Sequence, residues 1–357
     1  MGMAFLKRIL EPPRYGFDDP IGQLVKPTSG QILQEFFYRI NFIRDRRNWL
    51  SFWAWFAAAC LIAPLVVFLT QYFSWKLFIL GFVYSMVVLG THGTIYLHRF
   101  STHRAYRFRN LFWTFVCRNL VIKIIPEETY VVSHHVHHRF VEQPGDPYNV
   151  HGGFLYCFLA DVNHQPISRT LSEPDYKRVV GLVAHTGLKP NSYAQYQRWG
   201  SIAQPHRMIF HFVANWIFWY RVLFLVGGHA LATAIFGMSA IWAFGVRTFN
   251  FDGHGKGKDR RRVGIDFHWE DLSVNQVWPG YVAGEWHNNH HLFPSSARCG
   301  FLPYQVDLAW YFIKTWHSLG LISEYRDDKP QFMEKHFLAQ NLEGSERPKA
   351  TIVHSAT

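Results

Sequence analysis

The sequence predicts an all-α integral membrane protein, with four transmembrane helices in two hairpins beneath a helical cap on the cytosolic side. Two observations lead to this fold class. Apolar runs of membrane-spanning length occur in two closely linked pairs, and basic residues gather on one side of those pairs. In addition, 49% of the residues are hydrophobic and 18% aromatic, while the mean hydropathy is near neutral, so an apolar half must be balanced by a polar half.

The first pair of apolar runs covers residues 52–70 and 75–97, joined by the short segment 71–74. Each run is close to the ~20 residues that a helix needs to cross the hydrocarbon core of a bilayer. Because the link is so short, the two runs must form a hairpin, and its outer ends must lie on the same side of the membrane.

The second pair covers residues 208–226 and 229–246, joined through Gly227 and Gly228. Residues 98–207, between the hairpins, are mostly polar. Two weaker apolar runs at 111–125 and 152–160 are explained equally well as interfacial helices or as ordinary helices of the cap.

Basic residues indicate which side of the membrane holds the outer ends of the hairpins. The loops 71–74 and 227–228 carry no Arg or Lys, whereas the opposite side carries Arg44, Arg46, Arg47, Arg99, Arg104, Arg107, Arg247 and the basic run 256–262. By the positive-inside rule, both termini and the central segment are cytoplasmic, in a multi-pass protein that fits a bacterial inner membrane. This orientation accounts for the net charge of +11, and the sequence contains no recognisable element for reading nucleic acid.

The pattern divides the chain into three parts. We expect a cytosolic N-terminal segment with an interfacial helix at 1–48, in which no signal peptide is visible. The membrane domain follows at 49–325, and a polar C-terminal tail occupies 326–357.

Histidine is the unusual residue of this chain, with 21 copies, whereas the four cysteines are too scattered for a disulfide framework or an iron–sulfur cluster. The histidines gather in four places on the predicted cytoplasmic side, each near a membrane exit or in the cap. These sequences are His-Arg-Phe-Ser-Thr-His at 98–103, His-His-Val-His-His at 134–138, Asn-Phe-Asp-Gly-His at 250–254 and His-Asn-Asn-His-His at 287–291.

The spacing of these histidines indicates a metal site. Residues three and four apart share one face of a helix, so His134, His137 and His138 can point at one place, and the same spacing recurs at 287–291. His98 and His103 are five apart and would converge only at a kink or a helix end. So many imidazoles are too many for one ion and suit two, since a zinc site uses three or four ligands.

A single histidine is usually a structural residue, and most of the others are assigned that role. His135 lies between two positions of the pattern, so we expect it beside the site or at the surface. We assign no metal role to His92, His151, His164, His185, His211, His229 or His268. Asp146, Glu270 and Glu285 are candidates for fixing imidazole tautomers, although ordinary surface charge explains them as well.

The motifs at 98–103, 134–138 and 287–291 resemble the three histidine boxes of membrane fatty-acid desaturases. The segment 284–294 and the Asn250/His254 pair are especially similar to the acyl-CoA desaturase branch, the stearoyl-CoA type. The resemblance covers about residues 50–320. It implies two iron ions, molecular oxygen as co-substrate and an acyl tunnel between four spans and a cap. The metal residues that it implies are His98, His103, His134, His137, His138, His254, His287, His290 and His291, with Asn250 reaching one metal through water.

The chain departs from the family pattern around the active site. The segment 250–254 lacks the usual small residues, a basic run follows it, and the approach 91–97 to the first box is not glycine-rich. These departures leave the metal site intact, but they leave the substrate and the product open.

The leading interpretation is desaturation of a long-chain acyl group, held as acyl-CoA, free fatty acid or acyl carrier form. The chain has no haem, flavin or iron–sulfur motif, so a separate electron donor is implied: a ferredoxin, a rubredoxin or a cytochrome b5-like protein with its reductase. The basic run 256–262 could attract that donor, or it could simply anchor the chain at an anionic membrane surface.

Three alternatives remain. The same metal site could decarboxylate a free fatty acid to a terminal 1-alkene, or hydroxylate an acyl chain. A non-catalytic protein that binds lipid or metal is the alternative from another class, but lipid binding alone would not require nine histidines at these spacings.

Overall fold

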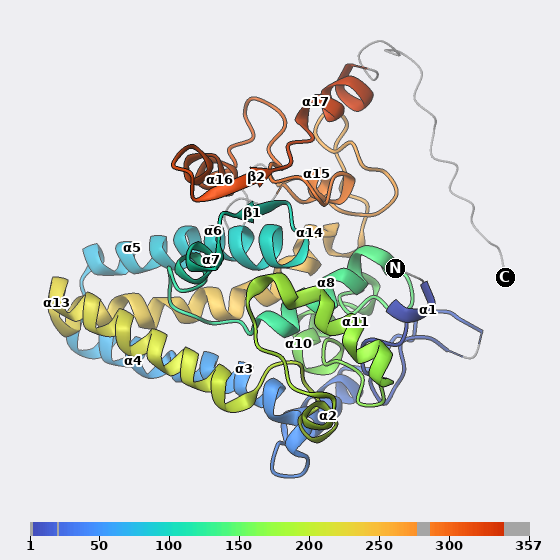
Figure 1. The fold of residues 1–357 in the computed structure, drawn as a ribbon, viewed down its shortest axis with the longest axis horizontal. Helices are drawn as coiled ribbons and strands as arrows, with labels where there is room; N and C mark the ends of the chain where they lie inside the picture. The colour runs from blue at the N-terminus through green and yellow to red at the C-terminus, as the bar shows by residue number, and fades with distance from the viewer. Residues whose placement is uncertain (1–2, 20, 277–285, 339–357) are drawn as a thin grey trace.

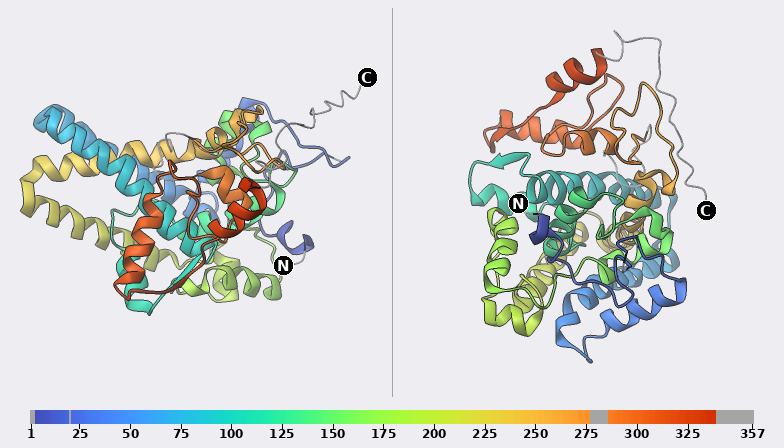
Figure 2. Two further views of the ribbon diagram at one scale, coloured as in Figure 1. Left: turned by 90° about the horizontal axis from the view of Figure 1, so that it is seen from above. Right: turned by 90° about the vertical axis from the view of Figure 1, so that its right-hand side faces the viewer.

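The computed structural model describes residues 3–19, 21–276 and 286–338. Three of its helices are long and apolar enough to cross a membrane: Arg46–Tyr72, Trp75–Thr102 and Pro205–Gly253. The first two contain the predicted runs 52–70 and 75–97 and extend them toward the polar side. The shorter elements of the chain gather toward one end of these long helices, as Figure 1 and Figure 2 show.

The third long helix contains both runs of the second predicted hairpin. Within it, α13 (Pro205–Gly245) is interrupted at Gly227, with φ −150° and ψ 23°, and at Gly228, with φ 65° and ψ −166°. The conformation of Gly228 is essentially restricted to glycine, so this pair allows a reversal within two residues. Figure 1 shows the two arms of α13 running back along each other. Two statements remain predictions: each arm crosses a membrane separately, and the histidine motifs lie on the cytosolic side.

The second arm of α13 packs closely against the helix that contains α4 (Ile62–Val67). A Cβ atom placed on Gly237 would lie 2.4 Å from the Cα of Leu65, so only a residue without a side chain fits this crossing. Close backbone approach at small residues is the usual way in which membrane helices associate.

Large apolar side chains remain exposed along the long helices. An apolar surface of this kind is rare on soluble monomers and is what a bilayer would cover. It includes Phe56, Ile62, Val66, Leu69, Trp75, Ile79, Leu80, Phe82, Val83, Val87, Val88, Phe210, Val213, Ile217, Phe218, Phe224, Leu225 and Val226.

The polar part is built around α8 (Glu127–Phe140), whose apolar face packs in a core with α11 (Glu173–Val183). The chain is mostly helical, but the prediction of an all-α protein missed one small sheet. Strand β1 (Tyr106–Phe108) pairs antiparallel with β2 (Ile322–Tyr325), which ties the segment after the first histidine motif to the C-terminal part. Two segments so distant in sequence give no local signal of pairing.

The remaining elements are short, and several carry or support the histidines. The α-helices are α1 Met3–Leu6, α2 Ser29–Ile40, α3 Trp49–Cys60, α5 Trp75–Val83, α6 Gly90–His92, α7 Leu111–Arg118, α9 Phe154–Phe158, α10 Ala160–Asn163, α12 Tyr193–Trp199, α14 Phe249–Gly253, α15 His287–Leu292, α16 Leu308–Ser318 and α17 Lys329–Phe332. The 3₁₀ and π turns are η1 Arg46–Asn48, η2 Phe68–Tyr72, η3 Tyr84–Leu89, η4 Gly93–Thr102, η5 Val150–Gly152, η6 Ala184–Thr186, η7 Val246–Thr248, η8 Gly255–Gly257 and η9 Met333–Leu338.

Candidate metal centre

The nine histidines singled out in the sequence form two compact groups. The five-histidine group contains His98, His103, His134, His138 and His290, and the four-histidine group contains His137, His254, His287 and His291. Within each group, one potential ligand atom from every residue lies within 4.8 Å of all the others. The two groups adjoin, since the rings of His138 and His291 have centroids 4.8 Å apart.

The five-histidine group has the geometry that one metal ion requires. The Nε2 atoms of His98, His134, His138 and His290 form a closed ring, with neighbouring atoms separated by 2.9, 3.1, 2.9 and 3.0 Å. Atoms about 3 Å apart are what neighbouring ligands present when each is about 2.1 Å from a shared ion, the usual metal–imidazole distance. His103 adds a fifth nitrogen, its Nε2, which is buried and has no hydrogen-bond partner among the described residues.

The first two histidines converge because the helix changes its winding. Residues 93–102 form the π-helix η4, and the amide of His103 donates to the carbonyl of His98 at 3.1 Å. A π-helix closes hydrogen bonds between residues five apart, so His98 and His103 lie on successive turns, with ring centroids 4.9 Å apart. The expectation of an irregular helix end at this motif is therefore confirmed.

Helices α8 and α15 each divide their histidines between the two groups. The prediction that His134, His137 and His138 point at one place was wrong: His134 and His138 join the five-histidine group, and His137 joins the other. Helix α15 does the reverse, sending His287 and His291 to the four-histidine group and His290 to the five-histidine group.

Helix geometry explains this division. At 3.6 residues per turn, positions four apart are only about 40° apart around the axis, whereas adjacent positions are about 100° apart. Each helix therefore supplies an i, i+4 pair to one group and the i+3 residue to the other, and the two groups lie side by side between the helices.

Three carboxylates fix imidazoles of the four-histidine group. Nδ1 of His137 donates to Oδ1 of Asp146 at 2.9 Å, Nδ1 of His254 to Oε1 of Glu142 at 2.8 Å, and Nδ1 of His291 to Oδ2 of Asp271 at 2.7 Å. Binding the carboxylate through Nδ1 leaves Nε2 as the free lone pair, the arrangement that holds metal-binding histidines in one tautomer.

Of the two expected carboxylates that the structure describes, Asp146 and Glu270, Asp146 lies in that position. Glu270 is exposed, and its neighbour Asp271 contacts His291 instead. Glu285 lies outside the described residues. The contact of Glu142 with His254 was not predicted, because the two residues are 112 positions apart in the sequence. Glu142 also adopts a left-handed φ of 59°, which no sequence pattern predicts.

Electrostatics keep most of these imidazoles in the form that binds metal. Burial, reinforced by neighbouring imidazoles, lowers the pKa of His134 and His138 well below the usual value. Burial also lowers the pKa of His137, but the carboxylates of Asp146, Asp271 and Glu142 outweigh it and raise that pKa overall. A neutral imidazole offers a lone pair to a metal, so the site is suited to a cation.

Asn250 lies beside the groups without joining either of them. Its Oδ1 is buried with no hydrogen-bond partner among the described residues. It lines a small cavity of about 50 Å³ together with His98 and His134. An unsatisfied buried acceptor next to the histidines supports a polar ligand there, and its contact to a metal through water stays a prediction.

The other histidines lie outside both groups. His135 is half-buried, with its ring centroid 6.5 Å from that of His103. His268 contacts Asp271 at 3.3 Å, and none of the other histidines that the structure describes joins a group.

The fold and site define a class: a mostly helical chain with three helices that could cross a membrane and two clustered groups of histidines that could hold metal ions. No family model matches the chain. It is 26% identical to an icosanoyl-CoA 5-desaturase of Limnanthes douglasii over 71% of this chain and 67% of that protein.

Two further relatives extend the comparison. The chain is 26% identical to a delta-9 acyl-lipid desaturase 2 of Arabidopsis thaliana, over 79% of this chain and 88% of the relative. It is 26% identical to an sn-1 stearoyl-lipid 9-desaturase of Synechocystis, over 74% and 76% respectively. The chain is thus similar in sequence to fatty-acid desaturases of the acyl-CoA and acyl-lipid types.

Proposed function

We propose that this protein is an oxygen-dependent di-iron desaturase that introduces a C=C bond into a long-chain fatty acyl substrate. The observation that supports the proposal is a pair of adjacent groups, one of five histidines and one of four, in a chain similar to fatty acyl desaturases. Two irons held there would activate molecular oxygen for removal of hydrogen from an unactivated C–H bond.

The residues of the chain have separate tasks in this proposal. The five-histidine group would hold one iron and the four-histidine group the other, with Asn250 contacting one of them through water. Three imidazoles of the four-histidine group would be held with Nε2 toward the metal by the carboxylates of Asp146, Glu142 and Asp271. Ligand sets without protein carboxylates leave the metal pair electrophilic, which suits attack on an alkyl chain.

Electrons must come from a separate protein, and the basic run 256–262 offers a docking surface for it. Lys256, Arg260 and Arg262 line an open groove of about 760 Å³ whose wall includes Phe249, next to Asn250. Phe249 also contacts His287, with ring centroids 5.0 Å apart. A small acidic donor such as a ferredoxin, rubredoxin or cytochrome b5-like protein would be attracted there.

We also propose the membrane arrangement that the basic residues predicted. The two arms of α13 cross separately, giving four spans, and the termini and metal centre lie in the cytoplasm. The exposed apolar surface of the long helices supports this arrangement.

The test is turnover by the purified, iron-loaded protein. It is supplied with electrons, oxygen and either acyl-CoA or free fatty acid, and both the lipid fraction and the headspace are analysed. A monounsaturated acyl product of unchanged length is expected. A volatile alkene one carbon shorter, or a hydroxylated chain, would overturn desaturation, and no product at two irons per protein would overturn the enzymatic proposal.

A further inference from the structure

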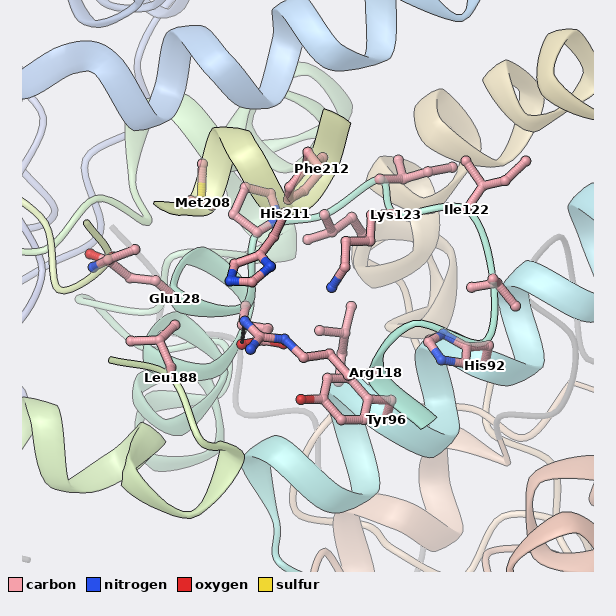
Figure 3. A pocket seen from close by; sticks show the side chains of 18 of the residues that line it. His92, Tyr96, Arg118, Ile122, Lys123, Glu128, Leu188, Met208, His211 and Phe212 are labelled. Atoms are coloured by element: carbon pink, nitrogen blue, oxygen red, sulfur yellow. Dashed lines mark hydrogen bonds and ion pairs between the residues drawn. The ribbon is translucent and has the colours of Figure 1, made fainter. Parts of the chain in front are cut away.

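A cavity of about 360 Å³ lies beside the metal centre, between the helix Trp75–Thr102, the connection from α7 to α8 and the start of α13. Among the charged residues of its lining, four are basic, namely Arg118, Lys123, Lys189 and Arg207, and two are acidic, namely Glu127 and Glu128. Figure 3 shows Lys123 and His211 pointing into one space, with the guanidinium of Arg118 facing them.

The charges in this cavity do not balance. Glu127 pairs with Arg118, with nitrogen–oxygen distances of 2.6 and 2.9 Å, so these two side chains neutralise each other. Glu128 accepts from the amide of Ala203 at 2.7 Å, and burial raises its pKa to about 7. Lys123, Lys189 and Arg207 have no ion pair among the described residues, so the cavity carries excess positive charge.

Of these three basic residues, Lys123 is half-buried, whereas Lys189 and Arg207 are exposed. The backbone at Lys123 is fixed to α13: its amide donates to Oδ1 of Asn215 at 2.9 Å, and its carbonyl accepts from Nε1 of Trp216 at 2.8 Å. The half-buried side chain is left to extend into the cavity. Desolvation, with the charge of Arg118, lowers the pKa of Lys123 to about 7, and the opposing charge of Glu127 only partly offsets this shift.

The cavity leads toward the metal centre. Gly93, Leu97, Ile125 and Trp242 line both this cavity and the small one that contains His98, His134 and Asn250. Three of these four residues are apolar, and the fourth is a glycine. The arrangement places the basic side chains in one cavity, His98 and His134 beside the other, and these four residues between the two.

We propose that Lys123 binds the carboxylate of a free long-chain fatty acid, whose alkyl chain runs along Leu97, Ile125 and Trp242 to the histidines. This inference rests on the proposed function and specifies the substrate class of that site. A thioester or ester presents only a neutral carbonyl and would leave the ammonium unpaired. Coenzyme A and phospholipid headgroups carry phosphates and are much bulkier than a carboxylate. The exposed Lys189 and Arg207 would guide the anion inward from the membrane surface.

Binding of radiolabelled palmitate tests the proposal, using the full chain in phosphatidylcholine nanodiscs without an electron donor, so that no turnover occurs. Lys123→Met should weaken palmitate binding about tenfold or more, the effect of losing one charge-assisted hydrogen bond. Lys123→Arg should stay within about threefold of the natural chain, because it keeps the charge. Lys314→Met, which removes an exposed lysine from α16, is the matched control and should bind palmitate normally.

Competition on the natural chain gives a test that does not depend on how any variant folds. Unlabelled palmitate should displace the label, whereas methyl palmitate, palmitoyl-CoA and added phosphatidylglycerol should not. Displacement by phosphatidylglycerol or palmitoyl-CoA at equal concentration would assign the cation to a phosphate and overturn the proposal, as would unchanged binding in Lys123→Met at full iron content.

The two proposals can fail separately. Binding that depends on Lys123, with no turnover of any acyl form at two irons per protein, would overturn only the enzymatic function. Turnover with palmitate binding unaffected by Lys123→Met would overturn only the headgroup site.

Discussion

At the scale of single residues, carboxylates orient the imidazoles of the four-histidine group. Three members of this group donate from Nδ1 to carboxylates. A carboxylate behind an imidazole raises its basicity as a ligand. We therefore expect these carboxylates to strengthen metal binding by the four-histidine group.

The contact between Asp271 and His291 gives a direct test of this effect. Burial opposes ionisation of Asp271, but the charge of His291 and hydrogen bonds from His268 and His291 outweigh it and hold the pKa of Asp271 well below its usual value. Asp271→Asn should reduce the affinity for one of the two irons by about tenfold or more. Chelator competition with metal analysis measures this loss. Glu270→Gln, which changes the exposed neighbour, should leave both affinities unchanged, and equal loss from both sites would contradict the assignment.

Single histidine replacements test the division between the groups. His137→Ala and His290→Ala each remove one member of a different group, and both should abolish turnover and lower the iron content. Mössbauer spectra of the two variants should lose different components. His135→Ala is the matched control, since His135 lies next to two members of the groups but joins neither. If His290→Ala retained turnover, the proposed ligand set would be wrong.

At the scale of helices, close packing in the membrane region depends on one position of α13. An alanine at Gly237 would place its Cβ 2.4 Å from the Cα of Leu65, and backbone cannot move aside as a flexible side chain can. Gly237→Ala should destabilise the protein by about 1–3 kcal/mol, the usual cost of overpacking. Gly245→Ala in the same helix meets no atom within 4 Å and should be neutral or slightly stabilising. Thermal unfolding of both variants in one detergent makes the comparison, and equal melting temperatures would contradict it.

Features that depend on neighbouring residues could be predicted from the sequence, whereas contacts between distant segments could not. The four apolar runs and the histidine pattern are local, and the structure places them in long helices and in two groups. The sheet between residues 106–108 and 322–325 is not local, and neither are the contacts that join His254 to Glu142 or His291 to Asp271. The division of α8 could not be read from the sequence, because the i, i+3, i+4 spacing also allows all three histidines to point at one place.

At the scale of the whole molecule, the proposed arrangement is a hydrophobic bundle with its chemistry at one end. Green fluorescent protein fused after Thr357 should fluoresce in a bacterial host, because we expect the C-terminus in the cytoplasm. Alkaline phosphatase inserted between Gly227 and Gly228 should be active outside, and the same enzyme inserted after Pro190 should be inactive. An active phosphatase at Pro190 would reverse the proposed orientation.

The order in which the ligands occur along the chain bears on how the protein is made. Helix α15, at 287–292, supplies His290 to the five-histidine group and both His287 and His291 to the four-histidine group. A ribosome adds about 5–20 residues per second, so for much of synthesis the nascent chain holds His98 and His103 without their partners. Neither group is complete until the last fifth of the protein is being made. In the proposed arrangement, metal loading would be the final step of maturation, after both hydrophobic hairpins have entered the bilayer. A chain truncated before residue 287 would then insert without completing either histidine group.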